Sequence, residues 1–456
     1  MGAPLPIDVG SDPRSRPVAD GFLSVSFDSL TSMHSSRWSD PRFRRWFGWA
    51  ALASVFLLVN FHRVSSAVLA ETLASAFDTT GAELGLLHAA FFYVYAPMQL
   101  FSGVLADRFG TRRVATIGTA VMGVGVLWFA TSGSYLSGFA ARLLLGLGGG
   151  VIYIATLRYC ANWFRVDEFA TVTGLTVSAA GVGGLLAATP LAIVVESTGW
   201  RTSLFAVGVV GLGLAVFVFG FVRDTPADAG LSAVEGAPEA DEQTFSEVVT
   251  GARTVLAARE TWVLGLMLFF GLGINFTVMG LWGVPYVVRA YDVSVRTASL
   301  YTLVGNAGLV VGPPTLGWLS DRLEERTGII LASALLYALA YLAIAAMGTP
   351  PLWFVGLAFF LVMFLLGGLL LSFTVAKESH ATEHSGIATG TINGMGYFGA
   401  AVLPGVMGWV LDVFWTGDTV AGNRVYSLFG YRVAFAIAAA GGVVALLCAA
   451  WIHRQS

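Results

Sequence analysis

The sequence predicts an all-α membrane protein with twelve transmembrane helices in two pseudo-symmetric six-helix bundles. Of its 456 residues, 56% are hydrophobic and 12% are charged, and the mean hydropathy is +0.75. Soluble globular domains carry about twice that charged fraction. Twelve apolar segments follow one another along the chain. Each is long enough to cross the hydrocarbon of a bilayer at about 1.5 Å per residue.

The chain opens with a polar segment, residues 1–41, that contains no apolar run. We expect this segment to be a disordered cytoplasmic tail without a cleavable signal peptide. Residues 42–222 are predicted to form the N-terminal bundle and residues 262–456 the C-terminal bundle. The predicted spans are 46–71, 83–105, 114–131, 135–158, 169–194 and 202–222 in the first half, and 262–286, 297–319, 328–347, 351–375, 386–412 and 431–452 in the second.

Residues 223–261 connect the two halves and are rich in polar residues. Between Phe245 and Leu256, apolar residues recur at helix-like spacing. This pattern favours a short amphipathic helix that lies at the cytoplasmic face of the membrane. A linker without regular structure is the alternative.

Basic residues near the ends of the first six spans lie almost entirely on one side of the predicted membrane. Arg44 and Arg45 precede the first span, Arg112 and Arg113 follow the second, and Arg201 lies on the opposite side. Because positive flanks stay in the cytoplasm, we expect a multi-pass protein of the plasma membrane with both termini cytoplasmic. Basic residues of the second half are nearly evenly divided, so this orientation rests on the first half.

The two cysteines, Cys160 and Cys448, lie far apart in the sequence. They argue against a disulfide framework and against a thiolate metal site. The spans contain no cluster of His, Asp, Glu or Cys, which disfavours a membrane enzyme. We therefore expect no cofactor, no metal, no nucleic-acid partner and no enzymatic activity.

A charged hairpin with the sequence GVLADRFGTRR connects the second and third spans. Its spacing resembles the loop 2–3 signature of the major facilitator superfamily, a family of membrane transporters. The matching residues are Gly103, Leu105, Asp107, Arg108, Gly110, Arg112 and Arg113. A six-plus-six architecture is supported by a partial second copy of the pattern, at Gly317, Leu319, Asp321 and Arg322.

The resemblance implies that this hairpin acts in gating. Asp107 would face the positive N-terminus of span eleven, which opens near Ala388, while pairing with a basic side chain. That contact would hold the cytoplasmic gate shut in the outward-facing state. Gly103 and Gly110 would allow close backbone approach and a sharp turn. The alternative is that these charges only fix the membrane topology.

Two arginines, Arg63 and Arg142, lie inside predicted spans. An arginine at the centre of a bilayer costs between about 2.5 and over 10 kcal/mol, so such a residue marks a candidate functional site. Apolar residues continue after Arg63, and Arg142 precedes a glycine-rich stretch, residues 146–150, that lets another helix approach closely. The alternatives are that Arg63 extends to the membrane surface and that Arg142 only anchors its span.

Within the superfamily, the first four spans most resemble the anion:cation symporter branch, which handles organic anions such as sugar acids and dicarboxylates. The resemblance lies in residues 62–65 (HRVS) and 85–91 (GLLHAAF), and in Tyr95, Gln99, Arg142, Gly146, Trp163 and Phe164. It implies that Arg63 binds the substrate carboxylate and that Arg142 lies beside the central cavity. A guanidinium group matches a carboxylate or phosphate bidentately.

The sequence departs from this branch at two positions where proton-coupling carboxylates are usual. His62 stands where Asp is frequent, and Gly149 stands at the acidic position of span four. No predicted span has Asp or Glu near its middle. A cavity with two buried arginines and no buried acid should be positive and prefer anions. His62 and His88 are the remaining candidates for proton coupling, with packing as the alternative role.

Further candidates for the substrate site are buried amides and aromatic residues. A buried amide needs hydrogen-bond partners, which favours Asn275, Asn306 and Asn393. Aromatic residues in spans mostly pack or form the interfacial belt, so we rank below them Tyr93, Tyr153, Trp282, Tyr301 and Tyr397.

Together these features predict a monomeric secondary active transporter that moves a small organic anion across the membrane by alternating access. Symport with H⁺ or Na⁺ is the expected form of coupling. One alternative is an efflux carrier for a neutral or amphipathic solute. Another is a sensor or scaffold that has this fold and does not transport.

Overall fold

The computed structural model describes residues 2, 40–232, 251, 253–381, 384–420 and 422–455. The chain divides into two units, Met1–Arg44 and Arg45–Ser456, and the second unit is the helical body described below. Nearly all of the predicted tail and most of the predicted amphipathic helix lie outside the described residues. Residues 253–257 of that segment are helical. The predicted boundaries of the two bundles stay predictions.

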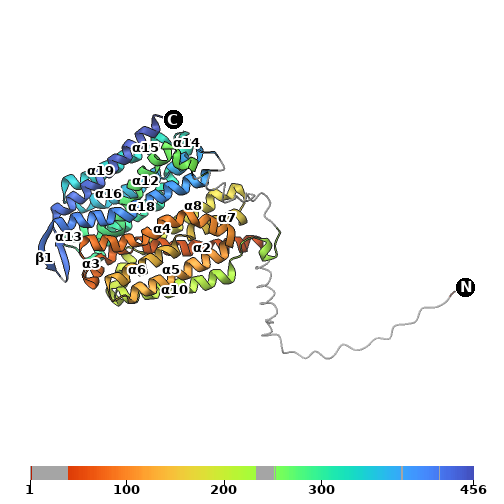
Figure 1. The fold of residues 1–456 in the computed structure, drawn as a ribbon, viewed down its shortest axis with the longest axis horizontal. Coiled ribbons are helices and arrows are strands. Elements are labelled where there is room, and N and C mark those ends of the chain that lie inside the picture. Colours follow the sequence, from red (N-terminus) through yellow and green to blue (C-terminus); the bar gives the residue numbers. More distant parts are fainter. Residues whose placement is uncertain are drawn as a thin grey trace, which may run out of the picture. The chain divides into compact units, whose positions relative to one another are not determined.

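The first half consists of long helices joined by short connections (Figure 1). In order, they are α2 (Pro41–Val64), α3 (Ser66–Phe77), α4 (Gly81–Phe109), α5 (Thr111–Thr131), α6 (Tyr135–Gly149), α7 (Ile152–Trp163), α8 (Val166–Leu186), α9 (Thr189–Thr198) and α10 (Trp200–Phe221). A short 3₁₀ turn, η1 (Ala227–Ala229), follows α10.

The second half repeats this organisation and adds a β-hairpin before its last helix. In order, its elements are α12 (Arg259–Thr277), the π-helix η2 (Val278–Trp282), α13 (Gly283–Tyr291), α14 (Val295–Leu323), α15 (Thr327–Met347), α16 (Leu352–Leu369), α17 (Ser372–Glu378), α18 (Ser385–Val413), β1 (Trp415–Val420), β2 (Asn423–Tyr426) and α19 (Leu428–His453). The two strands are antiparallel, with Thr419 opposite Arg424.

Each predicted span coincides with a helix or with a broken helix. In the described part of the chain, nine helical segments are long and apolar enough to cross a membrane, or eleven if each bent pair counts as one span. The remaining predicted span is α14, whose buried Thr302 and Asn306 and internal Pro313 and Pro314 lower its apolar character. The predicted all-α fold, with twelve spans in two six-helix bundles, is confirmed.

Breaks recur in the first span of each group of three. Ser65 separates α2 from α3, and residues 150–151 separate α6 from α7. In the second half, η2 interrupts span seven, and residues 370–371 separate α16 from α17. Such recurrence is expected of transporter folds built from repeated groups of three spans. The first break places Arg63 in the last turn of α2. The carbonyl groups at a helix C-terminus favour a cation, so this position stabilises the positive charge of Arg63.

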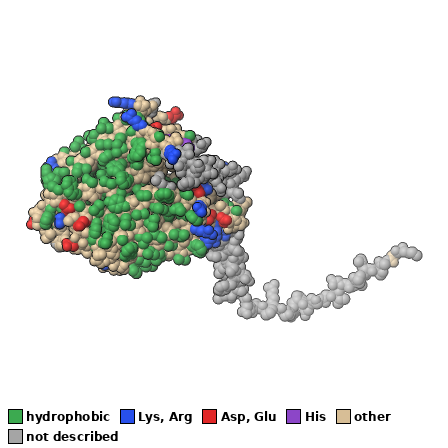
Figure 2. Space-filling model, viewed as in Figure 1, with side chains coloured by type: hydrophobic (Ala, Val, Ile, Leu, Met, Phe, Trp, Pro, Cys, Tyr) green, Lys and Arg blue, Asp and Glu red, His purple; other side chains and the backbone are tan. Residues whose placement is uncertain are grey.

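The surface of the helical body suits a bilayer. Figure 2 shows hydrophobic side chains over the middle of the visible face, with charged side chains toward its ends. Highly exposed hydrophobic residues include Val216, Leu447 and Trp409. A soluble protein rarely exposes so broad an apolar surface, whereas a lipid-facing belt requires it.

The two bundles meet most closely where α4 begins and α18 ends; we call this the Asp412 end, and the opposite end of these helices the Asp107 end. Figure 1 shows α4 and α18 side by side. A Cβ atom on Gly408 would lie 2.0 Å from the carbonyl oxygen of Gly81, so only glycine permits this approach. Toward the Asp107 end, a Cβ atom on Gly103 or Gly390 would meet no atom of the described residues within 4 Å.

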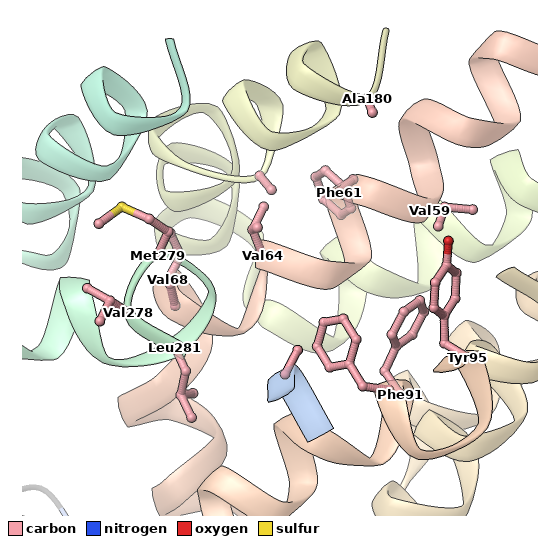
Figure 3. Packing of buried hydrophobic residues seen from close by; sticks show 14 of the residues in the cluster. Val59, Phe61, Val64, Val68, Phe91, Tyr95, Ala180, Val278, Met279 and Leu281 are labelled. Atoms are coloured by element: carbon pink, nitrogen blue, oxygen red, sulfur yellow. The ribbon is translucent and has the colours of Figure 1, made fainter. Parts of the chain in front are cut away.

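Hydrophobic packing joins the bundles beside the break in span one. Figure 3 shows Val278, Met279 and Leu281 of η2 near Val64 and Val68 of the first half. All five side chains are buried. The broken segments of spans one and seven therefore pack against each other, next to the turn that carries Arg63.

Candidate substrate-binding site

Arg63 is buried between the two bundles, with only 2% of its surface exposed. Its Cζ lies 4.3 Å from the ring centre of Tyr95 on α4 and 4.9 Å from that of Tyr397 on α18. Three more rings lie 5.7 to 5.9 Å away and belong to Phe56, Phe91 and Phe276. Cation–π contacts with a desolvated guanidinium contribute about 2 kcal/mol or more. Arg63 therefore does not extend to the protein surface.

Within the described residues, one edge of the Arg63 guanidinium has no hydrogen-bond partner. Its Nη1 donates a hydrogen bond to the hydroxyl of Tyr397 at 3.2 Å. Its Nε and Nη2, by contrast, have no hydrogen-bond partner among the described residues. These two nitrogens form one side of the planar group, and two parallel N–H donors match an oxyanion bidentately. Leaving buried donors unpaired is costly, so this edge is suited to bind an anion.

Arg142 on α6 is a second buried cation, also 2% exposed. Its Nη2 donates to the backbone carbonyl of His88 on α4 at 3.1 Å, and its Nε has no partner in the described part of the chain. His62 and His88 are both buried. The hydrogen bond to the His88 carbonyl places one of the two predicted histidines beside the second arginine.

No described acidic side chain neutralises these cations. None of the Asp and Glu residues whose burial is described is buried. The ion pairs of the described residues all lie on partly exposed side chains, such as Arg45 with Glu168 at 2.8 Å, and none includes Arg63 or Arg142. Within the described residues, the interior of the protein is therefore positively charged.

Two of the predicted residues of α18 face α4 beside Arg63. Tyr397 binds Arg63 and packs edge-on against Tyr95, with ring centres 4.7 Å apart. One turn earlier, Asn393 donates from Nδ2 to Oε1 of Gln99 at 3.3 Å. These two contacts connect the bundles at neighbouring turns of the same helix pair.

The other two predicted amides lie elsewhere. Asn306 on α14 donates to the carbonyl of Thr302 at 2.8 Å, and its Oδ1 faces Gly184 on α8. Asn275 on α12 accepts from the hydroxyl of Tyr341 on α15 at 3.4 Å, within the second half. Both are buried, but the structure gives neither a contact with Arg63 or Arg142.

The lower-ranked aromatic residues mostly serve packing. Tyr153 stacks on Phe56 with ring centres 5.0 Å apart, which places it at the border of the rings around Arg63. Tyr93 packs against a phenylalanine of α6, and Tyr301 faces Gly356 of α16. Trp282 donates from Nε1 to the carbonyl of Pro404 at 3.3 Å.

The charged hairpin after α4 is tied to its own bundle. Asp107 forms an ion pair with Arg158 of α7 at 3.2 Å. Gly110 has a φ of +80°, which favours glycine, and the backbone N–H of Arg112 donates to Asp224 at 2.6 Å. Asp107 makes no hydrogen bond or ion pair with the described residues of α18, and its predicted contact with span eleven stays a prediction. The other residues predicted to act in gating lie at the same hairpin or in its second-half copy and are exposed, namely Arg108, Arg113, Asp321 and Arg322. Their gating role stays a prediction.

The sequence analysis identified Tyr95 and Gln99 as part of the family resemblance but did not predict them as residues of the site. The signal for doing so is their spacing. Residues four apart share one face of a helix, so Tyr95 with Gln99 and Asn393 with Tyr397 form two facing pairs. It also missed Asp412, whose position near a span end is typical of an ordinary interfacial acid.

A family model identifies the fold independently. The model of the Major Facilitator Superfamily matches residues 50–313 and 268–456, which together cover most of the chain. The chain belongs to the major facilitator superfamily. It is a membrane transporter by family and not an enzyme, as the sequence predicted.

The chain is similar to several curated transport proteins. It is 28% identical over 370 residues to the probable sulfoacetate transporter SauU of Cupriavidus necator, covering 78% of this chain and 85% of that protein. It is 24% identical to a probable hexose phosphate transport protein of Chlamydia pneumoniae, covering 80% and 85%. It is 26% identical to the membrane sensor protein UhpC of Salmonella typhimurium, covering 91% and 94%. These relatives support the predicted likeness to the anion:cation symporter branch.

Solved structures share the fold. A bacterial homolog of the human lysosomal transporter Spinster, in an inward-facing and occupied conformation, aligns with a TM-score of 0.72 at 16% identity, covering 91% of this chain and 97% of that chain. The xylose transporter XylE of E. coli, in a partially occluded inward open conformation, aligns with a TM-score of 0.64 at 16% identity, covering 89% and 98%.

Proposed function

We propose that this protein is a secondary active transporter that moves a small organic anion across the plasma membrane by alternating access. The observation that carries the proposal is the buried guanidinium of Arg63, whose Nε and Nη2 have no partner among the described residues. A carboxylate, sulfonate or phosphate supplies the missing charge and two acceptor oxygens at once. Arg142 adds a second positive charge that favours the same class of substrate.

The names of the similar proteins support this substrate class. Sulfoacetate and hexose phosphates, named for two of them, are small oxyanions. We infer that this chain carries an anion of similar size and charge, with His62 and His88 as candidates for proton coupling.

The arrangement of charges supports an orientation with both termini in the cytoplasm. Arg45, Arg112 and Arg158 lie at the Asp107 end of the first half, and positive residues stay on the cytoplasmic side. With this orientation, the close contact of the bundles at the Asp412 end corresponds to an inward-facing conformation. Arg63 is buried in this conformation, so the anion reaches it from the Asp107 end after the helices there move apart.

The test is uptake into proteoliposomes that contain the purified protein. Labelled sulfoacetate, glucuronate and glucose 6-phosphate are offered separately, and neutral glucose serves as the charge control. We expect uptake of at least one anion and none of glucose. Uptake of neutral or cationic solutes instead would favour an efflux carrier of amphipathic compounds. Anion binding without any transport would favour a sensor, a role named for UhpC.

A further inference from the structure

We propose that Tyr397 is a positioning residue of the anion site, which holds Nη1 of Arg63 and so directs the free Nε and Nη2 edge toward the substrate. This inference rests on the proposed function and deepens it. The sequence suggested Tyr397 as a residue that contacts substrate directly. In the structure its hydroxyl is occupied by Arg63 instead, at 3.2 Å from Nη1.

The geometry around the guanidinium explains how the Tyr397 hydroxyl fixes the orientation of the unpaired edge, Nε and Nη2. The rings of Tyr95 and Tyr397 lie 4.3 and 4.9 Å from Cζ and meet each other at 70°. These rings restrict the position of the group but do not choose which of its edges is free. A guanidinium is rigid and planar, with its five donors in fixed directions. Anchoring Nη1 by one hydrogen bond therefore fixes the directions of Nε and Nη2.

The same hydrogen bond connects the two bundles, because Arg63 belongs to α2 and Tyr397 to α18. The neighbouring contact between Gln99 and Asn393 holds α18 against α4 at the next turn. The free edge of Arg63 is therefore oriented only while α18 stays close. Movement of α18 away from the first half removes the anchor, so the anion site weakens as the bundles rearrange. This links the affinity for the anion to the conformational change that transport requires.

The test measures binding of sulfoacetate, glucuronate and glucose 6-phosphate to the purified full-length protein by calorimetry. Hydrogen bonds to charged groups contribute about 1.5–3 kcal/mol, so we expect Tyr397→Phe to weaken binding by roughly tenfold or more. Tyr397→His keeps a ring atom that accepts a hydrogen bond and should recover part of the loss. Tyr337→Phe is the matched control, because its buried hydroxyl donates to the carbonyl of Gly271 in the second half. That control should bind like the wild type.

A double-mutant cycle separates positioning from direct contact. Arg63→Lys retains the charge but has no planar edge to orient. If Tyr397 acts through Arg63, adding Tyr397→Phe to Arg63→Lys changes the affinity by less than about twofold. If the two losses multiply instead, Tyr397 acts on the anion directly or through general stability, and the inference is wrong. Thermal unfolding of each variant shows whether it is folded. If Tyr397→Phe does not fold, Tyr397→His takes its place in the cycle.

Failure of this inference can be told apart from failure of the proposed function. If wild-type protein binds none of the three anions, the assignment of an anionic substrate fails and the inference falls with it. If wild-type protein binds an anion and Tyr397→Phe binds it equally well, the proposed function stands and only the positioning role is overturned. Tighter binding by Tyr397→Phe also overturns it, because the hydroxyl would then compete with the anion for Arg63.

Discussion

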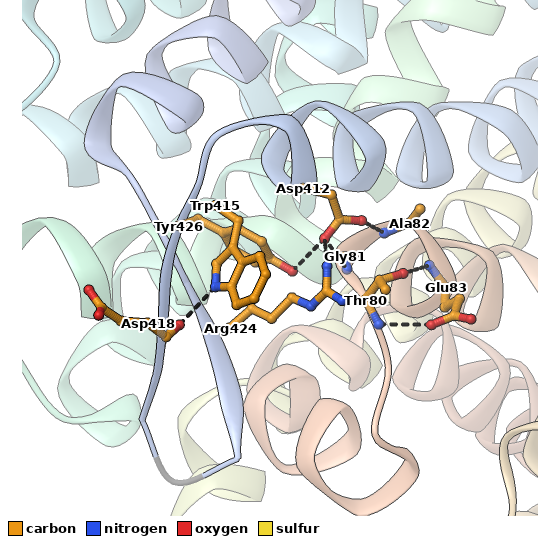
Figure 4. A network of polar contacts seen from close by, with 9 residues as sticks. All are labelled: Thr80, Gly81, Ala82, Glu83, Asp412, Trp415, Asp418, Arg424 and Tyr426. Atoms are coloured by element: carbon orange, nitrogen blue, oxygen red, sulfur yellow. Dashed lines mark hydrogen bonds and ion pairs between the residues drawn. The ribbon is translucent and has the colours of Figure 1, made fainter.

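The carboxylate of Asp412, in the last turn of α18, accepts a hydrogen bond from the backbone N–H of Gly81, in the first turn of α4, at 2.8 Å. Its second oxygen accepts from Ala82 at the same distance. Arg424 and Tyr426 of the β-hairpin also bind Asp412, at 3.3 and 3.2 Å (Figure 4). The first N–H groups of a helix lack partners within that helix. Here the opposite bundle supplies them.

The backbone N–H groups at the start of α4 thus receive hydrogen-bond acceptors from two places in the chain. Thr80 and Glu83 form a capping box, in which the Thr80 hydroxyl accepts from the backbone of Glu83 and the Glu83 carboxylate accepts from that of Thr80. Asp412 serves the two N–H groups between them and brings a negative charge to the positive end of the helix. Burial and the nearby Asp412 carboxylate raise the pKa of the Tyr426 hydroxyl above its usual value, so it remains a donor at physiological pH.

Asp412→Ala should shift the protein away from the conformation that is closed at the Asp412 end. A capping side chain contributes about 0.5–2 kcal/mol, so the ratio of the two conformations should change between about twofold and thirtyfold. Spin labels at Leu136 and Trp353, both exposed on the first turns of α6 and α16, report the separation of the bundles at this end. We expect a longer distance to gain population. An unchanged distance distribution would show that Asp412 does not hold this end closed.

Arg63→Ala should abolish anion uptake while the protein still folds and inserts. Truncating one member of a buried, hydrogen-bonded charge pair costs about 2–5 kcal/mol, which is a loss of more than about thirtyfold. Arg63→Lys should keep part of the activity, since it retains the charge without the bidentate edge. The measurement is the initial rate of uptake into proteoliposomes. Arg201→Ala is the control, because Arg201 is exposed and donates to the carbonyl of Ser132. Wild-type rates in Arg63→Ala would remove Arg63 from the site.

Gly146→Ala should destabilise the first half strongly. A Cβ atom at this position would lie 2.0 Å from the carbonyl oxygen of Phe91, so α6 and α4 must move apart. Overpacking of this kind typically costs about 1–3 kcal/mol. Gly174→Ala on α8 is the matched control, because its Cβ would meet no atom within 4 Å in the described part of the chain. We expect a lower unfolding temperature for Gly146→Ala and an unchanged or higher one for Gly174→Ala, since alanine favours helix. Equal temperatures would contradict the close packing of α4 and α6.

Hydropathy was sufficient to place the spans, because each predicted segment overlaps a helix of the structure. It could not place the breaks at Ser65 or in η2. A break is a matter of backbone hydrogen bonding, which hydropathy does not record. Residues 278–282 are as apolar as an unbroken helix, and the polar residues around Ser65 fit a substrate site in an unbroken helix equally well. The hairpin at residues 415–426 was missed for a related reason, since it is short and follows the eleventh span directly.

The central cations were predictable from the sequence and their surroundings were not. The sequence alone shows a charged residue inside an apolar segment, which is why Arg63 and Arg142 were identified. The rings of Tyr95 and Tyr397 are separated by about three hundred residues and meet only through the packing of α4 against α18. The role of Asp412 could not be predicted for the same reason. An acidic residue near a span end is usually an interfacial residue, and only the packing of the helices shows that Asp412 faces the N-terminus of α4.

Asp107→Asn should reduce the population of the outward-facing state. In this conformation Asp107 is exposed and pairs with Arg158, and the sequence predicts that it faces the N-terminus of span eleven when the Asp107 end closes. Asparagine removes the charge that such a helix terminus stabilises, typically by about 0.3–1 kcal/mol, so the population should fall by roughly two- to fivefold. Labelling of a single cysteine introduced into the outer cavity measures this population. Asp228→Asn is the matched control, because Asp228 is exposed in η1 and accepts its hydrogen bonds from Thr225 of the same turn. Equal labelling of wild type and Asp107→Asn would leave Asp107 with its ion pair to Arg158 and no part in closing the gate.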